Sequence, residues 1–171
     1  MDPLPIRKQH RLASYDYSTP GTYFLTICTH NRRCVLSEIA AGEGLAPPVP
    51  ALTEIGQIAE AQLLELPKRF PRVRIEKYVV MPNHIHMLLT LAEEKPAGGA
   101  SPAPTSVVDV VRVYKSLTTR LSRPFFSGSV LFQRSFYDHI VRNDEDFRNI
   151  WDYIDGNPGK WSEDRFWSEM L

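Results

Sequence analysis

The chain has 171 residues, 43% of them hydrophobic, which suits one domain, residues 1–171, around a single core. Lys and Arg together number 20, as do Asp and Glu, so the net charge argues against nucleic-acid capture by bulk electrostatics and leaves a local basic face as the route to such binding. The two cysteines form neither a CxxC pair nor a disulfide framework, and no apolar run suits a signal peptide or a membrane span. We therefore expect a cytoplasmic protein.

Three segments of the chain have the composition of exposed structure. A short basic arm near the start holds Arg7, Lys8 and Arg11, which can lie on phosphates or remain solvated. Residues 40–50 and 92–105 combine prolines with small residues. We expect both to be mobile surface loops.

The segments between the arm and the second loop predict strands and one helix. Aromatic and branched residues at positions 23–29 predict a central strand. Thr53 can cap a helix whose apolar residues recur at helical spacing until Pro67 stops it. Residues 73–80 and 84–91 then predict two strands joined by a turn or bulge.

The second of these two strands carries a pair of histidines. His84 and His86 point to the same side of the strand, because side-chain direction alternates along it. Such a pair can be buried and satisfied by backbone carbonyls, or it can hold a metal ion. The spacing alone leaves both interpretations open.

A helix is predicted from Thr105 or Ser106 to Ser122, with an apolar stripe on one side. A second stripe of this helix is polar and basic: Arg112, Lys115, Thr119 and Arg123. A face of this kind is usually solvated, and it can also bind phosphates.

The last predicted helix carries a tyrosine that is not on its apolar face. Residues 136–142 are expected to be extended, Asn143 can cap the helix, and the helix should end near residues 156–158. Its buried stripe is Phe147, Ile150, Trp151 and Ile154. Tyr153 lies off this stripe and faces the same way as Asn157, one turn later. An ordinary boundary tyrosine would also suit this position.

The order of these elements predicts an α+β sandwich with helices on one or both faces of a mainly antiparallel sheet. Three blocks of sequence, residues 81–86, 132–142 and 153–158, resemble the REP-associated tyrosine transposases, which are IS200-like members of the HUH single-strand DNA transposase superfamily. The resemblance runs over nearly the whole chain and keeps the order of the blocks. It implies a ferredoxin-like antiparallel sheet with flanking helices.

The resemblance also implies roles for four residues. His84, His86 and Asn157 would hold a divalent metal ion, magnesium or manganese, and Tyr153 would be the nucleophile. A tyrosine whose pKa has its ordinary value of about 10 is a poor nucleophile at neutral pH. A metal ion that neutralises the phosphate lowers the barrier to attack by the tyrosine, so the four residues suit one reaction. No general base is evident in the sequence.

The implied activity is that of a transposase, a metal-dependent single-stranded DNA endonuclease and strand transferase that forms a 5′-phosphotyrosine at repeat-type DNA hairpins. The alternative is a domesticated nucleic-acid-hairpin binding module that has lost turnover. A third interpretation is a metal hydrolase that uses water in place of Tyr153.

Binding of single-stranded or hairpin DNA would need cations near the site. The candidates are Arg7, Lys8, Arg11, Arg112, Lys115, Arg123, Arg134 and Arg142. Related enzymes occur as monomers and as dimers that exchange the tyrosine helix, and both states remain open for this chain.

Overall fold

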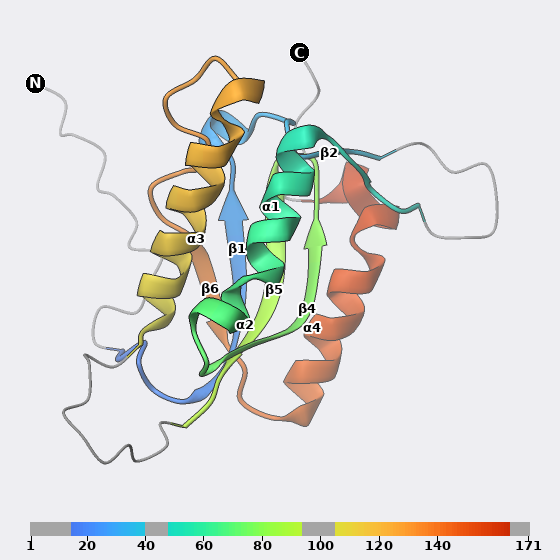
Figure 1. Cartoon of the computed structure of the whole chain (residues 1–171). Helices are drawn as coiled ribbons and strands as arrows, with labels where there is room; N and C mark the ends of the chain where they lie inside the picture. The colour runs from blue at the N-terminus through green and yellow to red at the C-terminus, as the bar shows by residue number, and fades with distance from the viewer. Residues whose placement is uncertain (1–14, 40–47, 94–104, 165–171) are drawn as a thin grey trace, which may run out of the picture.

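The computed structural model describes residues 15–39, 48–93 and 105–164, where a four-stranded antiparallel sheet is the central element (Figure 1). The sheet strands are β1 (Gly21–Cys28), β4 (Val73–Val80), β5 (His84–Leu91) and β6 (Tyr137–Ile140). Their spatial order is β4-β5-β1-β6, so the second, third, first and fourth sheet strands of the chain lie side by side. With helices joining the first to the second strand and the third to the fourth, this is the ferredoxin-like arrangement, and the predicted fold class is confirmed.

The helices cover both faces of this sheet. They are α1 (Glu54–Leu64), α2 (Leu66–Arg69), α3 (Val107–Ser122) and α4 (Asp144–Gly156), with short 3-10 turns η1 (His30–Arg32), η2 (Arg123–Phe125) and η3 (Pro158–Glu163). The two-residue strands β2 (Ser37–Glu38) and β3 (Ala51–Leu52) pair with each other outside the main sheet. Helices α1 and α3 contact each other, and α4 contacts β4 and β5 (Figure 1).

Strand β5 is buried on both faces, and its side chains alternate between two hydrophobic clusters, one on each face of the sheet. Ile85, Met87 and Leu89 belong to the larger cluster, which α1 and α3 also form. Leu88 belongs to a smaller cluster with Ile150 and Ile154 of α4. Because neighbouring side chains point to opposite faces, the even-numbered positions of β5 are directed toward α4.

The ends of the helices follow the capping residues. The Thr53 hydroxyl accepts a hydrogen bond from the Gly56 amide at 3.1 Å, and the Asn143 side chain accepts one from the Asp146 amide at 2.8 Å. The predicted strand at 136–142 is shorter in the structure, because β6 spans Tyr137–Ile140. The expected mobile loops at 40–50 and 92–105 lie largely outside the described residues.

A lysine on the edge strand fixes α4 to the sheet. The β4 register shifts between Ile75 and Lys77, and Lys77 pairs with Leu88, on the face toward α4. Its ammonium lies 2.5 Å from Asp155 Oδ1 and 4.2 Å from the centre of the Trp151 ring. Both contacts are on α4, so this cation holds the helix that carries Tyr153.

Within the parts of the chain that the structure describes, no helix combines the length and hydrophobicity needed to cross a lipid bilayer.

Helix α1 approaches the chain near β2 so closely that one position requires glycine. A Cβ atom added to Gly56 would lie 1.9 Å from the carbonyl oxygen of Leu36. That oxygen also accepts a hydrogen bond from the Thr53 amide at 3.1 Å, so it cannot move away without cost. In contrast, a Cβ added to Gly156 would meet no atom within 4 Å.

We expect Gly56→Ala to lower the free energy of unfolding by about 1–3 kcal/mol, because the added methyl group overpacks a backbone contact. The matched variant Gly156→Ala should leave stability unchanged or raise it by about 0.5 kcal/mol through the lower entropy of the unfolded chain. Urea unfolding of both variants measures the difference. Equal midpoints for the two variants would contradict the close packing of α1 against Leu36.

Candidate active site

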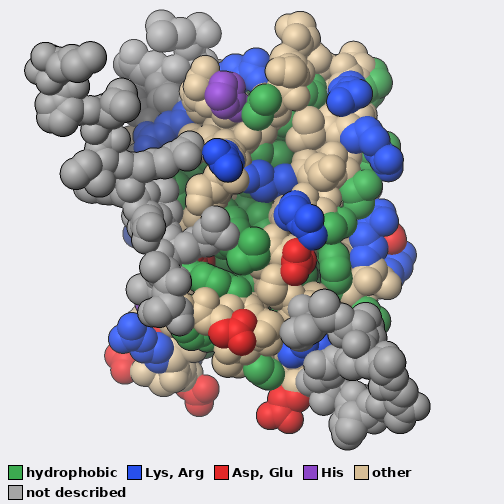
Figure 2. Space-filling view, turned by 90° about the vertical axis from the view of Figure 1, so that its left-hand side faces the viewer, with side chains coloured by type: hydrophobic (Ala, Val, Ile, Leu, Met, Phe, Trp, Pro, Cys, Tyr) green, Lys and Arg blue, Asp and Glu red, His purple; other side chains and the backbone are tan. Residues whose placement is uncertain are grey.

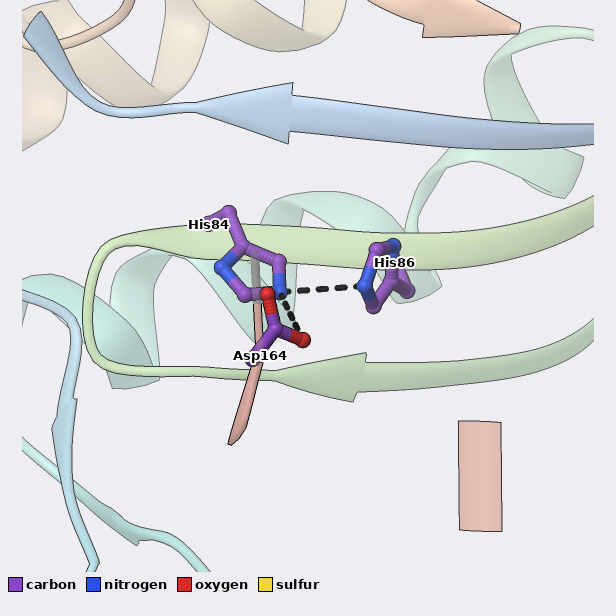
Figure 3. A group of neighbouring side chains, drawn as sticks. All are labelled: His84, His86 and Asp164. Atoms are coloured by element: carbon purple, nitrogen blue, oxygen red, sulfur yellow. Dashed lines mark hydrogen bonds and ion pairs between the residues drawn. The ribbon is translucent and has the colours of Figure 1, made fainter. Parts of the chain in front are cut away.

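Two buried imidazole rings lie side by side on the face of β5 that α4 covers. His84 and His86 are both fully buried, and they pair across the sheet with Cys28 and Thr26 of β1. Their Nε2 atoms are 3.0 Å apart, and their ring centres are 4.4 Å apart (Figure 3). The prediction that both rings point to one side of a strand therefore agrees with the structure.

The outer nitrogen of each ring has a hydrogen-bond partner that orients the ring. The Asn83 side-chain oxygen lies 2.9 Å from His84 Nδ1, and the Asn83 amide nitrogen donates to the Arg32 carbonyl at 3.2 Å. Because the Asn83 oxygen can only accept, His84 carries its proton on Nδ1 when neutral and presents a lone pair at Nε2.

His86 has a more adaptable partner. The Thr26 hydroxyl lies 2.8 Å from His86 Nδ1, and a hydroxyl can donate or accept. With no ion between the rings, His86 Nε2–H can donate to His84 and Thr26 can donate to Nδ1. When a cation binds both Nε2 atoms, His86 carries its proton on Nδ1 and donates it to Thr26. The same contacts thus suit both states.

Helix α4 brings Tyr153 to this pair of rings from the same chain. The phenol oxygen lies 3.4 Å from His86 Nε2, and the tyrosine ring packs edge-on against Phe24 at 5.9 Å between centres. Tyr153 is 43% exposed, whereas the two imidazoles are fully buried. The structure thus brings the phenol and the imidazole pair together around a common space.

Asn157 lies one turn after Tyr153 and is almost fully buried. Its side-chain nitrogen donates to Asp164 Oδ2 at 2.8 Å. Its side-chain oxygen is buried and has no hydrogen-bond partner among the described residues. A buried carbonyl oxygen without a partner is costly, so this atom is suited to a ligand such as a cation.

Asp164 is a site residue that the sequence analysis did not identify. Its Oδ2 atom lies 3.9 Å from His84 Nε2 (Figure 3). The same oxygen lies 3.5 Å from the Tyr153 hydroxyl. The turn η3 brings the chain back over the site, and the Asp164 side chain is only 1% exposed. No spacing rule links this carboxylate to the histidines, because the turn after Pro158 alone determines its position.

The donor set fits a divalent metal ion. His84, His86 and Asp164 offer ligand atoms that lie within 4.8 Å of one another. Two ligands at about 2.1 Å from one ion and at a right angle would lie about 3 Å apart, which is the separation of the Nε2 atoms. The side-chain oxygen of Asn157, which is buried without a hydrogen-bond partner among the described residues, would offer an amide ligand of the kind that magnesium and manganese accept.

The cations predicted to bind DNA are spread over the surface. Arg112 pairs with Asp109 at 2.8 Å, and Arg123 lies in η2. Arg134 is exposed in the segment before β6, and Arg142 is exposed at the turn into α4. Arg7, Lys8 and Arg11 lie outside the described residues.

Lys115 belongs to the polar stripe of α3, but its ammonium group contacts the neighbouring chain segment. Its ammonium donates to the carbonyl oxygens of Arg134 at 3.1 Å and Ser135 at 3.3 Å, and also to that of Gln133. This lysine therefore anchors the segment before β6 to α3.

Comparison with known proteins finds several chains that are similar to this one. An uncharacterised protein of Haemophilus influenzae is 28% identical over 94% of this chain and 93% of its own length. A REP-associated tyrosine transposase of Escherichia coli is 27% identical over 84% of this chain and 70% of its own length. No protein-family model matches the chain.

The fold also agrees with a solved structure. A REP-associated tyrosine transposase bound to a REP hairpin superimposes with a TM-score of 0.60 at 25% identity, over 90% of this chain and 74% of that one. The chain is therefore similar in sequence and fold to REP-associated tyrosine transposases, in agreement with the resemblance of its sequence blocks.

Proposed function

We propose that the protein is a metal-dependent single-stranded DNA endonuclease and strand transferase that acts at repeat-type DNA hairpins. The observation that carries this proposal is the 3.4 Å separation between the Tyr153 hydroxyl and His86 Nε2 within one chain. The relative with a solved structure is bound to a REP hairpin, which supports hairpin DNA as the substrate class.

In the proposed reaction the Tyr153 oxygen attacks a backbone phosphorus, and the bond from phosphorus to the 3′ oxygen breaks. The products are a 5′-phosphotyrosine and a free 3′-hydroxyl, which takes up a proton as it leaves. The new ester keeps the energy of the phosphodiester, so a second strand end can displace the tyrosine without a nucleotide cofactor. Strand exchange, rather than hydrolysis, is the outcome.

His84, His86 and Asn157 would hold the ion, magnesium or manganese, and the ion would supply positive charge that neutralises the scissile phosphate. A ring nitrogen that binds a cation cannot also accept a proton. Asp164, whose Oδ2 lies 3.5 Å from the phenol oxygen, is then the nearby group that can accept the Tyr153 proton.

A binding module that recognises hairpins without cutting them is the alternative function. The half-exposed phenol beside two buried imidazoles favours the enzyme, because a pure binding surface has no need of this arrangement. Of the three functions, only the proposed strand transferase forms a covalent intermediate, so this intermediate separates it from the binding module and from a hydrolase that uses water.

Tyr153→Phe should abolish the covalent protein–DNA adduct while leaving DNA affinity within about twofold of wild type, since the ring remains and only the nucleophilic oxygen is lost. A labelled hairpin oligonucleotide incubated with manganese and resolved on a denaturing gel measures the adduct. Tyr78→Phe is the matched control, because the Tyr78 hydroxyl bonds to Glu60 on the opposite face. Hairpin cleavage that persists in Tyr153→Phe would favour the water-using hydrolase.

Thr26→Val should weaken manganese binding about 10- to 100-fold, because it removes the hydrogen bond that orients His86 without changing a ligand. Thr22→Val is the matched control on the same strand and face, where the hydroxyl bonds to Thr90 at 2.9 Å. Manganese titration by calorimetry measures both. Wild-type affinity in Thr26→Val would show that His86 does not depend on this contact.

Asp164→Asn should slow adduct formation by about 10²- to 10⁴-fold, which is the usual contribution of a proton acceptor, and should leave manganese affinity within a few-fold of wild type. Single-turnover rates and manganese titration are measured on the same preparation. A loss of manganese affinity as large as the loss of rate would make Asp164 a metal ligand instead.

A further inference from the structure

An open hollow of about 390 Å³ lies between α3 and the segment that follows η2. Among the residues that the structure describes, its lining includes the side chains of Lys115, Arg120 and Arg123 and no carboxylate. Three hydroxyl residues complete its polar wall: Ser116, Thr119 and Ser129. On this side of the molecule, Lys and Arg side chains gather toward the upper part of the view in Figure 2, and Asp and Glu lie lower.

Two guanidinium groups in this hollow lack a counter-charge. Arg120 and Arg123 are exposed and three residues apart, so they lie on one side of the helix and repel each other. In the described part of the chain, neither makes an ion pair or a side-chain hydrogen bond. Ser116 and Thr119 stand one turn before them on the same side, so hydroxyl and guanidinium donors face the same space.

The opposite wall of the hollow is held in place. Lys115 donates to the carbonyls of Arg134 and Ser135, just after the wall residue Phe132. Arg33 donates to the carbonyl of Val130 at 3.3 Å from the other side. The donors of α3 therefore face a braced segment, which lowers the entropy that a ligand must overcome.

The hollow lies at the same end of the sheet as the imidazoles. Phe132 forms a bridge with Thr29, and the Gln133 amide donates to the Cys28 carbonyl at 2.9 Å. Cys28 is the register partner of His84 on its other side. Two strand spacings, about 10 Å, therefore separate the His84 backbone from the wall of the hollow.

We infer that this hollow is a binding site for the backbone phosphates of a DNA strand, with Arg120 and Arg123 as the principal donors. These donors suit phosphate, because a guanidinium group can donate two parallel hydrogen bonds to phosphate oxygens and nearby hydroxyl groups can donate to the remaining oxygens. Since the hollow lies at the imidazole end of the sheet but on the face that α3 covers, it would hold DNA that continues past the cleaved bond around the end of the sheet. In this respect the inference rests on the proposed function, whereas binding itself does not require cleavage.

The test uses a fluorescent single-stranded DNA 20-mer of random sequence, because phosphate contacts do not depend on sequence. Affinity is measured by anisotropy from 50 to 300 mM salt for wild type and for the double variant Arg120→Gln with Arg123→Gln. We expect affinity at 50 mM salt to fall at least tenfold, and the salt slope to become shallower by about 1.4, from about 0.7 per lost phosphate contact. Arg→Lys at both positions should keep the wild-type slope.

The charge-matched control is Lys68→Gln with Arg69→Gln on α2, at the opposite end of the sheet, and it should bind like wild type. Unchanged affinity and slope in the Arg120 and Arg123 variant would overturn the inference, and so would a wild type that does not bind the oligonucleotide at 50 mM salt. An RNA 20-mer that binds through these arginines while DNA does not would also overturn it. If wild type binds DNA through the hollow but forms no adduct, the proposed reaction fails and the binding site stands.

Discussion

The site depends on the burial of two imidazole rings with their Nε2 atoms 3.0 Å apart. Two lone pairs cannot face each other at this distance in a dry environment, so either a proton or a cation must lie between them. The neighbours of the rings permit both conditions. Asn83 determines the tautomer of His84, and the Thr26 hydroxyl adapts to that of His86. Strand β5 can therefore hold an ion there without rearrangement of the sheet.

Burial of apolar side chains also explains why much of the fold could be predicted from the sequence. Strands 73–80 and 84–91 were predicted with the bounds that the structure has, because their branched and aromatic residues have no other favourable arrangement. Helix boundaries followed capping residues, as Thr53 and Asn143 show. The predicted strand at 136–142 was too long, because pairing with β1 ends at Ile140 and no pattern in the sequence marks that limit.

The candidate site was predictable where its residues share one element. His84 and His86 are two residues apart on a strand, and Tyr153 and Asn157 are one turn apart on a helix. The periods of a strand and of a helix therefore predict that each pair shares one side of its element. The convergence of the two pairs came from the resemblance to a family, not from the pattern. Asp164 was missed because a 3-10 turn with a kink at Lys160 determines its position. Lys115 was one of several candidates for binding phosphate, and its contacts with three carbonyl oxygens are tertiary, so helical spacing could not predict them.

The two clusters of the core differ greatly in size, and this difference bears on motion. Helix α4 packs on the sheet through the smaller cluster, whose buried members are Leu88, Ile150 and Ile154. Regions with few buried apolar contacts open at lower free energy than the rest of a domain. We therefore expect α4, held by this cluster and by Lys77, to open at a lower free energy than the pairing of β1 with β5. In the proposed reaction, a DNA end joined to Tyr153 would then move with α4 while the other strand end stays at the sheet.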